Sequence, residues 1–219
     1  MPMNMNSNQA FSFSEIRNKW LNEMLPLNGY TPSNLIQPLG LPPTSKLENA
    51  KLLADRKEII ALMPKNSKVC EVGTQEGIFA EYILETANPS EMHLLDIDLS
   101  PLTSRNSLPL TDSRVKLHEG DSSSLLKNFP NEYFDWIYID GDHSYEGALK
   151  DAMAAVKKIP VNGYLLFNDF TIWSPVECID YGVPYVVCEI LRNYPFVVSH
   201  FAFHPLGYHD IALKKVESI

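Results

Sequence analysis

The chain has 219 residues, which is enough for one domain with a sizeable hydrophobic core and too few for two domains of ordinary size. Its 18 Lys and Arg against 27 Asp and Glu give a formal net charge of −9, and no run of basic residues is present that would neutralise a row of phosphates. These features argue against nucleic acid and anionic membrane surfaces as partners.

The apolar runs are short, and the first residues lack the apolar core of a targeting segment. We therefore expect a cytoplasmic protein that does not associate with membranes. The three cysteines, Cys70, Cys178 and Cys188, are far apart, odd in number and surrounded by apolar residues. This pattern indicates buried free thiols in a reducing compartment rather than a disulfide framework.

The N-terminal part predicts little regular structure. Residues 1–10 are expected to form a disordered leader, and a helix-like stretch follows at Phe13–Leu25. Pro26–Pro43 is rich in Pro, Gly, Asn and Ser, which predicts an irregular arm of the kind that often covers a site. Apolar residues at helical spacing predict a helix within Leu47–Met63. We therefore divide the chain into a leader and arm at 1–46 and a main domain at 47–219.

From there strands and helices alternate, which requires a parallel sheet with helices on both faces. Helices are expected to begin near Gly77, Ser122, Tyr145 and Pro184. The predicted strands are Lys68–Val72, Met92–Asp96, Val115–His118, Trp136–Ile139 and Tyr164–Phe167, followed by a terminal hairpin of Phe196–His204 and Asp210–Val216. The predicted fold class is a doubly wound α/β fold: a mostly parallel, Rossmann-like sheet of seven strands with a C-terminal antiparallel hairpin and an N-terminal helical arm.

In such a sheet, ligands bind outside the carboxyl ends of the strands. The first predicted strand runs into the motif Glu71-Val72-Gly73-Thr74-Gln75-Glu76-Gly77. Its G-x-x-x-G spacing differs from the G-x-G-x-x-G of pyrophosphate binders, and Glu71 would repel a phosphate but accept a hydrogen bond from an amino-acid ammonium. A plain tight turn would explain the two glycines alone.

Acidic residues also follow the second and third strands. Asp96 or Asp98 is placed to accept hydrogen bonds from ribose hydroxyls. Asp121 is placed to accept one from an adenine amino group, whereas Ser122 is expected to cap the next helix. Taken singly, each of these acids is most simply explained as a solvent-exposed side chain. Together with the glycines they predict a pocket for a nucleoside that carries an amino acid, such as S-adenosylmethionine.

The fourth and fifth strands end in Asp140 and in Asn168-Asp169, whose oxygens suit Mg²⁺ or a similar divalent ion. His143 lies three residues after Asp140 and is a candidate general base. In the competing interpretation, Asp142 or Ser144 caps the next helix and His143 is a surface residue. The remaining histidines have no zinc-type spacing and are expected to be structural, and Tyr145 and Trp173 either line a substrate entrance or belong to the core.

The sequence from about Lys68 to Trp173 resembles class I S-adenosylmethionine-dependent methyltransferases, in particular the small-molecule group near the macrocin-type sugar O-methyltransferases. The motif at 71–77, Glu91-Met92-His93-Leu94-Leu95-Asp96, and Tyr138-Ile139-Asp140-Gly141-Asp142-His143-Ser144-Tyr145-Glu146 carry the resemblance. It implies that the cofactor is held by Glu71, Gly73, Thr74, Gly77, Asp96 (or Asp98), Asp121, Ser122 and Asp140.

The resemblance also implies a metal site at Asp140, Asn168 and Asp169, with His143 and Asp140 as catalytic residues. Asn168 departs from the Asp that is common at this position, which weakens the case for a metal. The leading hypothesis is O-methylation of a hydroxyl on a small molecule, either a sugar or an aromatic compound, with S-adenosylmethionine and a divalent ion, Mg²⁺ or another.

Three alternatives remain at this stage. They are a metal-independent methyltransferase of the same fold, a nicotinamide dehydrogenase, and an inactive module that keeps the cofactor pocket. Specificity for the acceptor is expected to lie in Pro26–Pro43 and Thr171–Val183, where residue types define no ligand. The sequence leaves open whether the chain forms a homo-oligomer.

Overall fold

The computed structural model of the chain describes residues 12–19, 22, 38–105, 108–177 and 179–219. The predicted leader, Cys178, most of the predicted arm and the end of the predicted first helix lie outside these residues. The chain divides into two compact units, one comprising residues 39–171 and 181–219 and the other residues 1–38 and 172–180.

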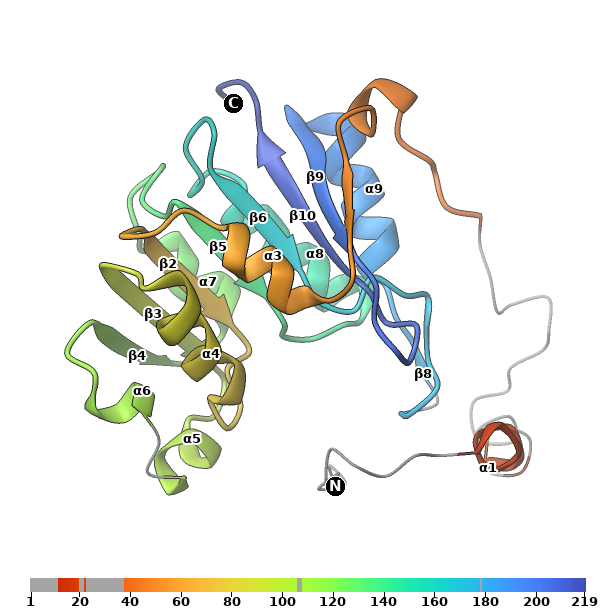
Figure 1. Cartoon of the computed structure of the whole chain (residues 1–219), viewed down its shortest axis with the longest axis horizontal. Helices are drawn as coiled ribbons and strands as arrows, with labels where there is room; N and C mark the ends of the chain where they lie inside the picture. The colour runs from red at the N-terminus through yellow and green to blue at the C-terminus, as the bar shows by residue number, and fades with distance from the viewer. Residues whose placement is uncertain (1–11, 20–21, 23–37, 106–107, 178) are drawn as a thin grey trace. The chain divides into compact units, whose positions relative to one another are not determined.

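The larger unit is built on an eight-stranded sheet in the order β1-β9-β10-β6-β5-β2-β3-β4 (Figure 1). Only β10 is antiparallel to its neighbours, β9 and β6, and all other pairs are parallel. The strands are β1 (Lys51–Leu53), β2 (Lys68–Val72), β3 (Glu91–Asp96), β4 (Val115–Glu119), β5 (Trp136–Ile139), β6 (Tyr164–Phe167), β9 (Phe196–Ala202) and β10 (Asp210–Lys215). The predicted doubly wound fold with a terminal antiparallel hairpin is confirmed.

Helices cover both faces of this sheet, and each layer has its own hydrophobic core. Ile59, Ile83 and Leu102 pack on one face, and Leu126, Ala152 and Ile190 pack on the other. Figure 1 shows α3 and α4 in front of the strands and α7 and α8 behind them. The helices are α3 (Arg56–Leu62), α4 (Ile78–Ala87), α5 (Ser100–Ser104), α6 (Leu108–Thr111), α7 (Ser122–Lys127), α8 (Tyr145–Ala155) and α9 (Val183–Asn193).

The helix predicted within Leu47–Met63 is only partly present. A 3-10 turn, η3, forms at Thr44–Lys46, and β1 pairs in parallel with β9 before α3 begins at Arg56. The sheet therefore has one strand more than the seven expected. Strand β1 is short and lies at the sheet edge, with two of its three residues exposed. Its residues therefore do not alternate between apolar and polar, and the sequence shows no strand pattern there.

The strand order reverses between β2 and β5, because β3 and β4 extend the sheet on one side and β6 extends it on the other. Val72 is paired with Ile139, and Ile139 with Phe167. The residues that follow these three partners, Gly73, Asp140 and Asn168, therefore emerge side by side at one edge of the sheet. This reversal is where ligands bind in open α/β sheets.

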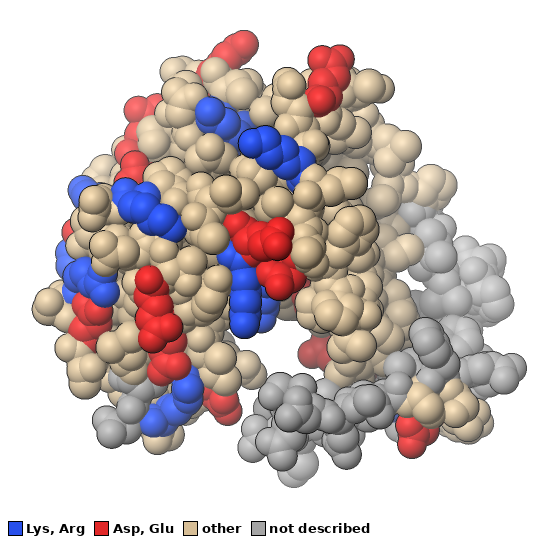
Figure 2. Space-filling view, viewed as in Figure 1, with Lys and Arg blue, Asp and Glu red and all other residues tan. Residues whose placement is uncertain are grey.

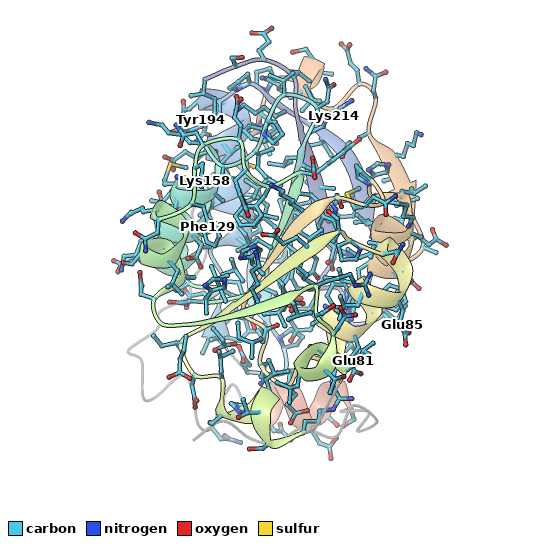
Figure 3. The ribbon with its side chains drawn as sticks, turned by 90° about the vertical axis from the view of Figure 1, so that its left-hand side faces the viewer. Glu81, Glu85, Phe129, Lys158, Tyr194 and Lys214 are labelled. Atoms are coloured by element: carbon cyan, nitrogen blue, oxygen red, sulfur yellow. The ribbon has the colours of Figure 1, made fainter. Side chains whose placement is uncertain are left out.

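Two buried lysines lie near the amino end of β6. Lys158 donates to the Phe129 carbonyl at 2.7 Å, and Lys215 donates to the Ile159 carbonyl at 2.7 Å. Figure 3 shows Lys158 beside Phe129. These cations are satisfied by backbone oxygens, as buried charges require.

The smaller unit contains α1 (Phe13–Lys19) and the antiparallel pair β7 (Trp173–Ser174) and β8 (Ile179–Asp180).

Within the described residues, no helix combines the length and apolar character needed to cross a membrane. Lys and Arg are interspersed with Asp and Glu on the face shown in Figure 2. This face therefore presents no continuous basic surface of the kind that tracks a nucleic-acid backbone.

Candidate active site

The glycine loop after β2 passes very close to the end of β5. Gly73 has a positive φ of 83°, and a Cβ atom on it would lie 2.0 Å from the Asp140 carbonyl oxygen. The Asp140 amide donates to the Val72 carbonyl at 2.8 Å, and the Gly73 amide donates to the Leu95 carbonyl at the same distance. Only glycine satisfies both the backbone conformation and this close approach. Gly77, with φ 74°, is the N-cap of α4, which begins at Ile78.

Glu71 is the penultimate residue of β2 and is buried, with 1% of its surface exposed. Thr74 Oγ1 donates a hydrogen bond to its Oε2. The pKa of Glu71 is raised to about 8, chiefly by burial and also by nearby Asp140, although the hydrogen bond from Thr74 lowers it. The carboxyl group is therefore mostly protonated at neutral pH, and an approaching cation would favour its ionised form.

Asp96 ends β3 and is tied to the glycine loop. Its Oδ2 accepts from the Gln75 amide at 2.7 Å and its Oδ1 from the Asp98 amide at 3.1 Å. Asp98 is exposed, and its Oδ1 accepts from the Ser100 amide at 2.9 Å, at the start of α5. Of the two predicted ribose acceptors, Asp96 is thus the one attached to the loop after β2.

Asp121 is the N-cap of α7, because its Oδ1 accepts from the Ser124 amide at 2.8 Å. The prediction that Ser122 caps this helix is wrong. Ser122 is the first helical residue, and its hydroxyl donates to Asp151 in α8. Burial raises the pKa of Asp151 to about 6. Asp151 was not among the predicted site residues, because its position inside a helix gives no local signal.

The ends of β5 and β6 bring His143 and two acids together. His143 Nε2 lies 3.4 Å from Asp140 Oδ1 and 3.8 Å from Asp169 Oδ2. The imidazole stacks on Tyr181 with ring centroids 4.6 Å apart, and 19% of the side chain is exposed. It is therefore not an exposed surface residue. Ser144 caps α8 by accepting from the Gly147 amide at 3.1 Å, as one alternative predicted.

Asn168 lies buried between these acids and a second group of polar side chains. One end of its amide lies 2.8 Å from Asp169 Oδ1 and 2.9 Å from Asp140 Oδ1, and the other lies 2.9 Å from Arg56 Nη1 and 3.1 Å from Tyr138 Oη. In one orientation the amide nitrogen donates to the two carboxylates and the oxygen accepts from Arg56. In the other, the nitrogen donates to Tyr138 Oη at 3.1 Å and the oxygen faces the carboxylates. Without a cation between the oxygens, the first orientation avoids setting three acceptors against one another.

Arg56, Tyr138 and Asp210 were not among the predicted site residues. Tyr138 donates to Asp210 Oδ2 at 2.7 Å, and Arg56 Nη1 donates to Tyr138 Oη at 3.3 Å. Strand alternation would have placed Tyr138 on the same face as Asp140, two residues later. Nothing in the local sequence marks Arg56 at the start of a short helix.

Burial raises the pKa of two carboxyl groups in this cluster. The pKa of Asp169 is raised to about 7, with Asp140 adding to the shift and His143 opposing it. The pKa of Asp210 is raised to about 6, against the opposing hydrogen bond from Tyr138. Perturbed acids that converge at strand ends are typical of functional sites.

The two aromatic residues considered for a substrate entrance lie in different units. Tyr145 donates to Glu189 Oε2 at 2.9 Å and so is directed toward α9. Trp173 forms part of β7 in the smaller unit. Their role at an entrance stays a prediction.

The sheet order and the site at its reversal define a class I methyltransferase fold. Residues 70–170 match the family model described as a methyltransferase domain. This segment runs from β2 to the loop after β6 and contains most of the residues described above. No curated protein matches the chain by sequence.

Solved structures with this fold include proteins of several activities. The pyocyanin biosynthetic protein PhzM has a TM-score of 0.57 and 20% identity, over 73% of this chain and 54% of its own. Spermidine synthase from Thermotoga maritima has a TM-score of 0.53 and 18% identity, over 74% of this chain and 57% of its own. A third is 1,6-didemethyltoxoflavin-N1-methyltransferase from Burkholderia thailandensis, solved with bound S-adenosylhomocysteine. Its TM-score is 0.55 and its identity 16%, over 74% of this chain and 76% of its own.

The chain thus spans just over half the length of the first two of these proteins. At such low identities the likeness establishes the fold, and the activity has to be argued from the site.

Proposed function

We propose that the protein transfers the methyl group of S-adenosylmethionine to a hydroxyl oxygen of a small molecule, with His143 as the general base. The observation that carries this proposal is the convergence of His143, Asp140 and Asp169 beside the Gly73 loop at the sheet reversal. The match of residues 70–170 to a methyltransferase domain supports the same cofactor.

The cofactor would lie over the ends of β2, β3 and β5. Glu71 would ionise beside the ammonium of the methionine part, and the narrow loop at Gly73, Thr74 and Gly77 would let the backbone approach it. Asp96 would accept hydrogen bonds from the ribose hydroxyls, and the hydrogen bond from the Gln75 amide to its carboxylate supports this role. Asp121 and Ser122, at the start of α7, would lie near the adenine.

Methyl transfer is an in-line displacement. The acceptor oxygen forms a bond to the methyl carbon as the carbon–sulfur bond breaks, and the sulfonium becomes a neutral thioether. The acceptor proton would pass to His143 Nε2, while Asp140 and Asp169 would stabilise the imidazolium that forms. Stacking on Tyr181 restricts the ring orientation, which keeps Nε2 directed at the site.

A divalent ion fits this site only if the amide oxygen of Asn168 takes part. No group of three His, Cys, Asp or Glu side chains in the described part of the chain is arranged to hold a metal. One end of the Asn168 amide, however, lies 2.8 Å and 2.9 Å from oxygens of Asp169 and Asp140, close to the roughly 3 Å between neighbouring oxygens around Mg²⁺. Asp140, Asn168 and Asp169 would hold the ion, which would lower the pKa of the acceptor hydroxyl.

Arg56 favours a second candidate, a metal-independent methyltransferase in which the guanidinium supplies the positive charge of the cluster. Arg56 Nη1 lies 3.8 Å from Asp140 Oδ2. Turnover that persists after exhaustive chelation would select this candidate, and turnover that is lost and then restored by Mg²⁺ would select the first.

Calorimetric titration with S-adenosylhomocysteine tests the cofactor assignment. We expect binding to the unsubstituted protein and none of comparable strength with NAD. Asp96→Ala should weaken binding by about ten-fold or more, because it removes a charge-assisted hydrogen bond. Asp98→Ala, which removes an exposed acid two residues away, should bind like the parent. Tight NAD binding without S-adenosylhomocysteine binding would reject the proposal.

The acceptor class is tested separately. A panel of sugars and aromatic compounds that carry hydroxyl groups, with matched amines in place of the hydroxyls, should yield methylated products only from the hydroxyl compounds. Methylation of the amines alone would show that the acceptor atom is nitrogen.

A further inference from the structure

Arg56 is a cation placed inside the acidic cluster at the ends of β5 and β6. It is the first residue of α3, and its side chain is 34% exposed. Its guanidinium carbon lies 4.3 Å from the centre of the Phe79 ring, a cation–π contact that orients the group. Nη1 reaches both Tyr138 Oη and Asp140 Oδ2, at 3.3 Å and 3.8 Å.

The cluster around this cation carries several acids. Asp140 and Asp169 come from β5 and β6, and Asp210 comes from the start of β10. Burial lowers the pKa of Arg56, but Tyr138, Asp140 and Asp210 raise it by more, so that the guanidinium remains charged. In the described part of the chain, Arg56 and His143 both lie within 4 Å of Asp140, and His143 also lies within 4 Å of Asp169.

The amide of Asn168 connects this cation to the carboxylates. When the amide oxygen points to Arg56 Nη1, 2.9 Å away, the nitrogen faces Asp140 and Asp169. In the reverse orientation the nitrogen donates to Tyr138 Oη at 3.1 Å instead. A divalent ion held by the same residues would need the opposite orientation, because only the amide oxygen is a ligand. That orientation would set the amide nitrogen against the Arg56 nitrogen, so that two donors would face each other at 2.9 Å.

We propose that Arg56 is a built-in competitor of the divalent ion at this site, which holds the Asn168 amide in its metal-free orientation and makes divalent binding weak. Two effects act in the same direction. The guanidinium repels a divalent cation at short range. It also stabilises the amide orientation in which the Asn168 oxygen cannot bind the ion. This proposal concerns the site of the proposed function but does not require that methyl transfer occurs there.

Binding of Mn²⁺ alone, followed by calorimetry and by the electron paramagnetic resonance signal of the free ion, tests the proposal. Arg56→Met should bind Mn²⁺ at least about ten-fold more tightly than the parent protein. Arg105→Met is the matched control. Arg105 is 36% exposed and pairs with Glu81 at 3.1 Å, so it has similar exposure and a carboxylate partner outside the cluster. This control should leave Mn²⁺ affinity unchanged.

If Arg56→Met does not fold, as judged by circular dichroism, Arg56→Gln removes the charge while keeping a donor for the Asn168 oxygen, and it should also tighten Mn²⁺ binding. A folded variant without a gain in affinity would overturn the proposal. So would a micromolar dissociation constant for Mn²⁺ in the unsubstituted protein, whatever the variants do. S-adenosylhomocysteine binding, measured in parallel, reports on the proposed function independently, because Arg56 can compete with Mn²⁺ whether or not that cofactor binds.

Discussion

His143 is held by its surroundings in a way that suits proton transfer. Its carbonyl accepts from the Gly182 amide at 2.7 Å, its ring stacks on Tyr181, and its Nε2 faces two carboxylates. The hydrogen bond fixes the backbone, and the stacking restricts the ring. The buried Nε2 lies beside acids rather than in an apolar environment. A base that is already oriented loses little freedom in the transition state.

Replacement of His143 by Ala should lower turnover by about 10²- to 10⁴-fold, the usual contribution of a general base. Affinity for S-adenosylhomocysteine should stay nearly unchanged, because the imidazole is assigned to the acceptor side. Steady-state kinetics and calorimetry measure the two quantities. The control is His118→Ala. It removes a ring that is hydrogen-bonded to His93 at 2.9 Å, and it should change stability more than turnover. Parental turnover by the His143 variant at all pH values would remove this role.

At the scale of single elements, the start of α3 decides where Arg56 lies. The Asp55 side chain accepts from the amides of Lys57 at 2.8 Å and Glu58 at 3.2 Å, so the helix begins at Arg56. Strand β1 precedes this helix, and its pairing with β9 fixes where the helix begins in space. The cap and the strand together position the guanidinium, although neither touches the carboxylates.

Asp55→Ala should reduce the free energy of unfolding by about 1 kcal/mol, because two amides in the first turn of α3 lose their acceptor. Asp55→Ser, which can still cap, should lose only a few tenths of this value. Chemical denaturation of both variants measures the difference. Equal losses in the two variants would mean that Asp55 acts through its charge rather than as a cap.

At the scale of the whole molecule, the buried acids make stability depend on pH. The pKa of Glu71 is raised from an ordinary 4.5 to about 8 in the folded protein, and that of Asp169 from 3.8 to about 7. The folded state therefore keeps protons that the unfolded state has lost. Such groups contribute stability that is complete below the unfolded pKa and is lost as pH rises through the folded pKa.

Four histidines change the stability with pH in the opposite direction, and they do so in a more acidic pH range. Burial lowers the pKa values of His93, His118, His200 and His204. Their contribution to stability is present above the unfolded value of 6.5 and is lost as pH falls below it. Above neutral pH these four histidines are largely uncharged in both states, so they add little to the pH dependence there.

The free energy of unfolding should consequently fall by about 1 to 2 kcal/mol between about pH 7 and pH 8.5. Denaturant titrations at several pH values measure it. Glu71→Gln should flatten most of this slope, because the amide cannot ionise, and the remainder should come from Asp169. A slope that is identical in parent and variant would show that Glu71 is not the titrating group.

The sequence by itself determined the layout of the domain and most of the sheet edge where the candidate site lies. The strands β2, β5 and β6 have the predicted bounds. β5 and β6 consist of apolar and aromatic residues, β2 carries Val69, Cys70 and Val72 beside the buried Glu71, and each strand is followed by Gly, Asp or Asn. Parallel topology then requires that Gly73, Asp140 and Asn168 emerge at one edge, so their proximity follows from strand order alone.

Only the tertiary structure decided the charge balance of the site. Arg56 and Tyr138 are 82 residues apart, and Tyr138 and Asp210 are 72 apart. Their meeting depends on how α3 packs on the sheet and on the antiparallel pairing of β10 with β6, which local propensity does not encode. The orientation of the Asn168 amide was likewise beyond the sequence, because it is set by donors and acceptors from β5, β6 and α3 that come together only in the folded chain.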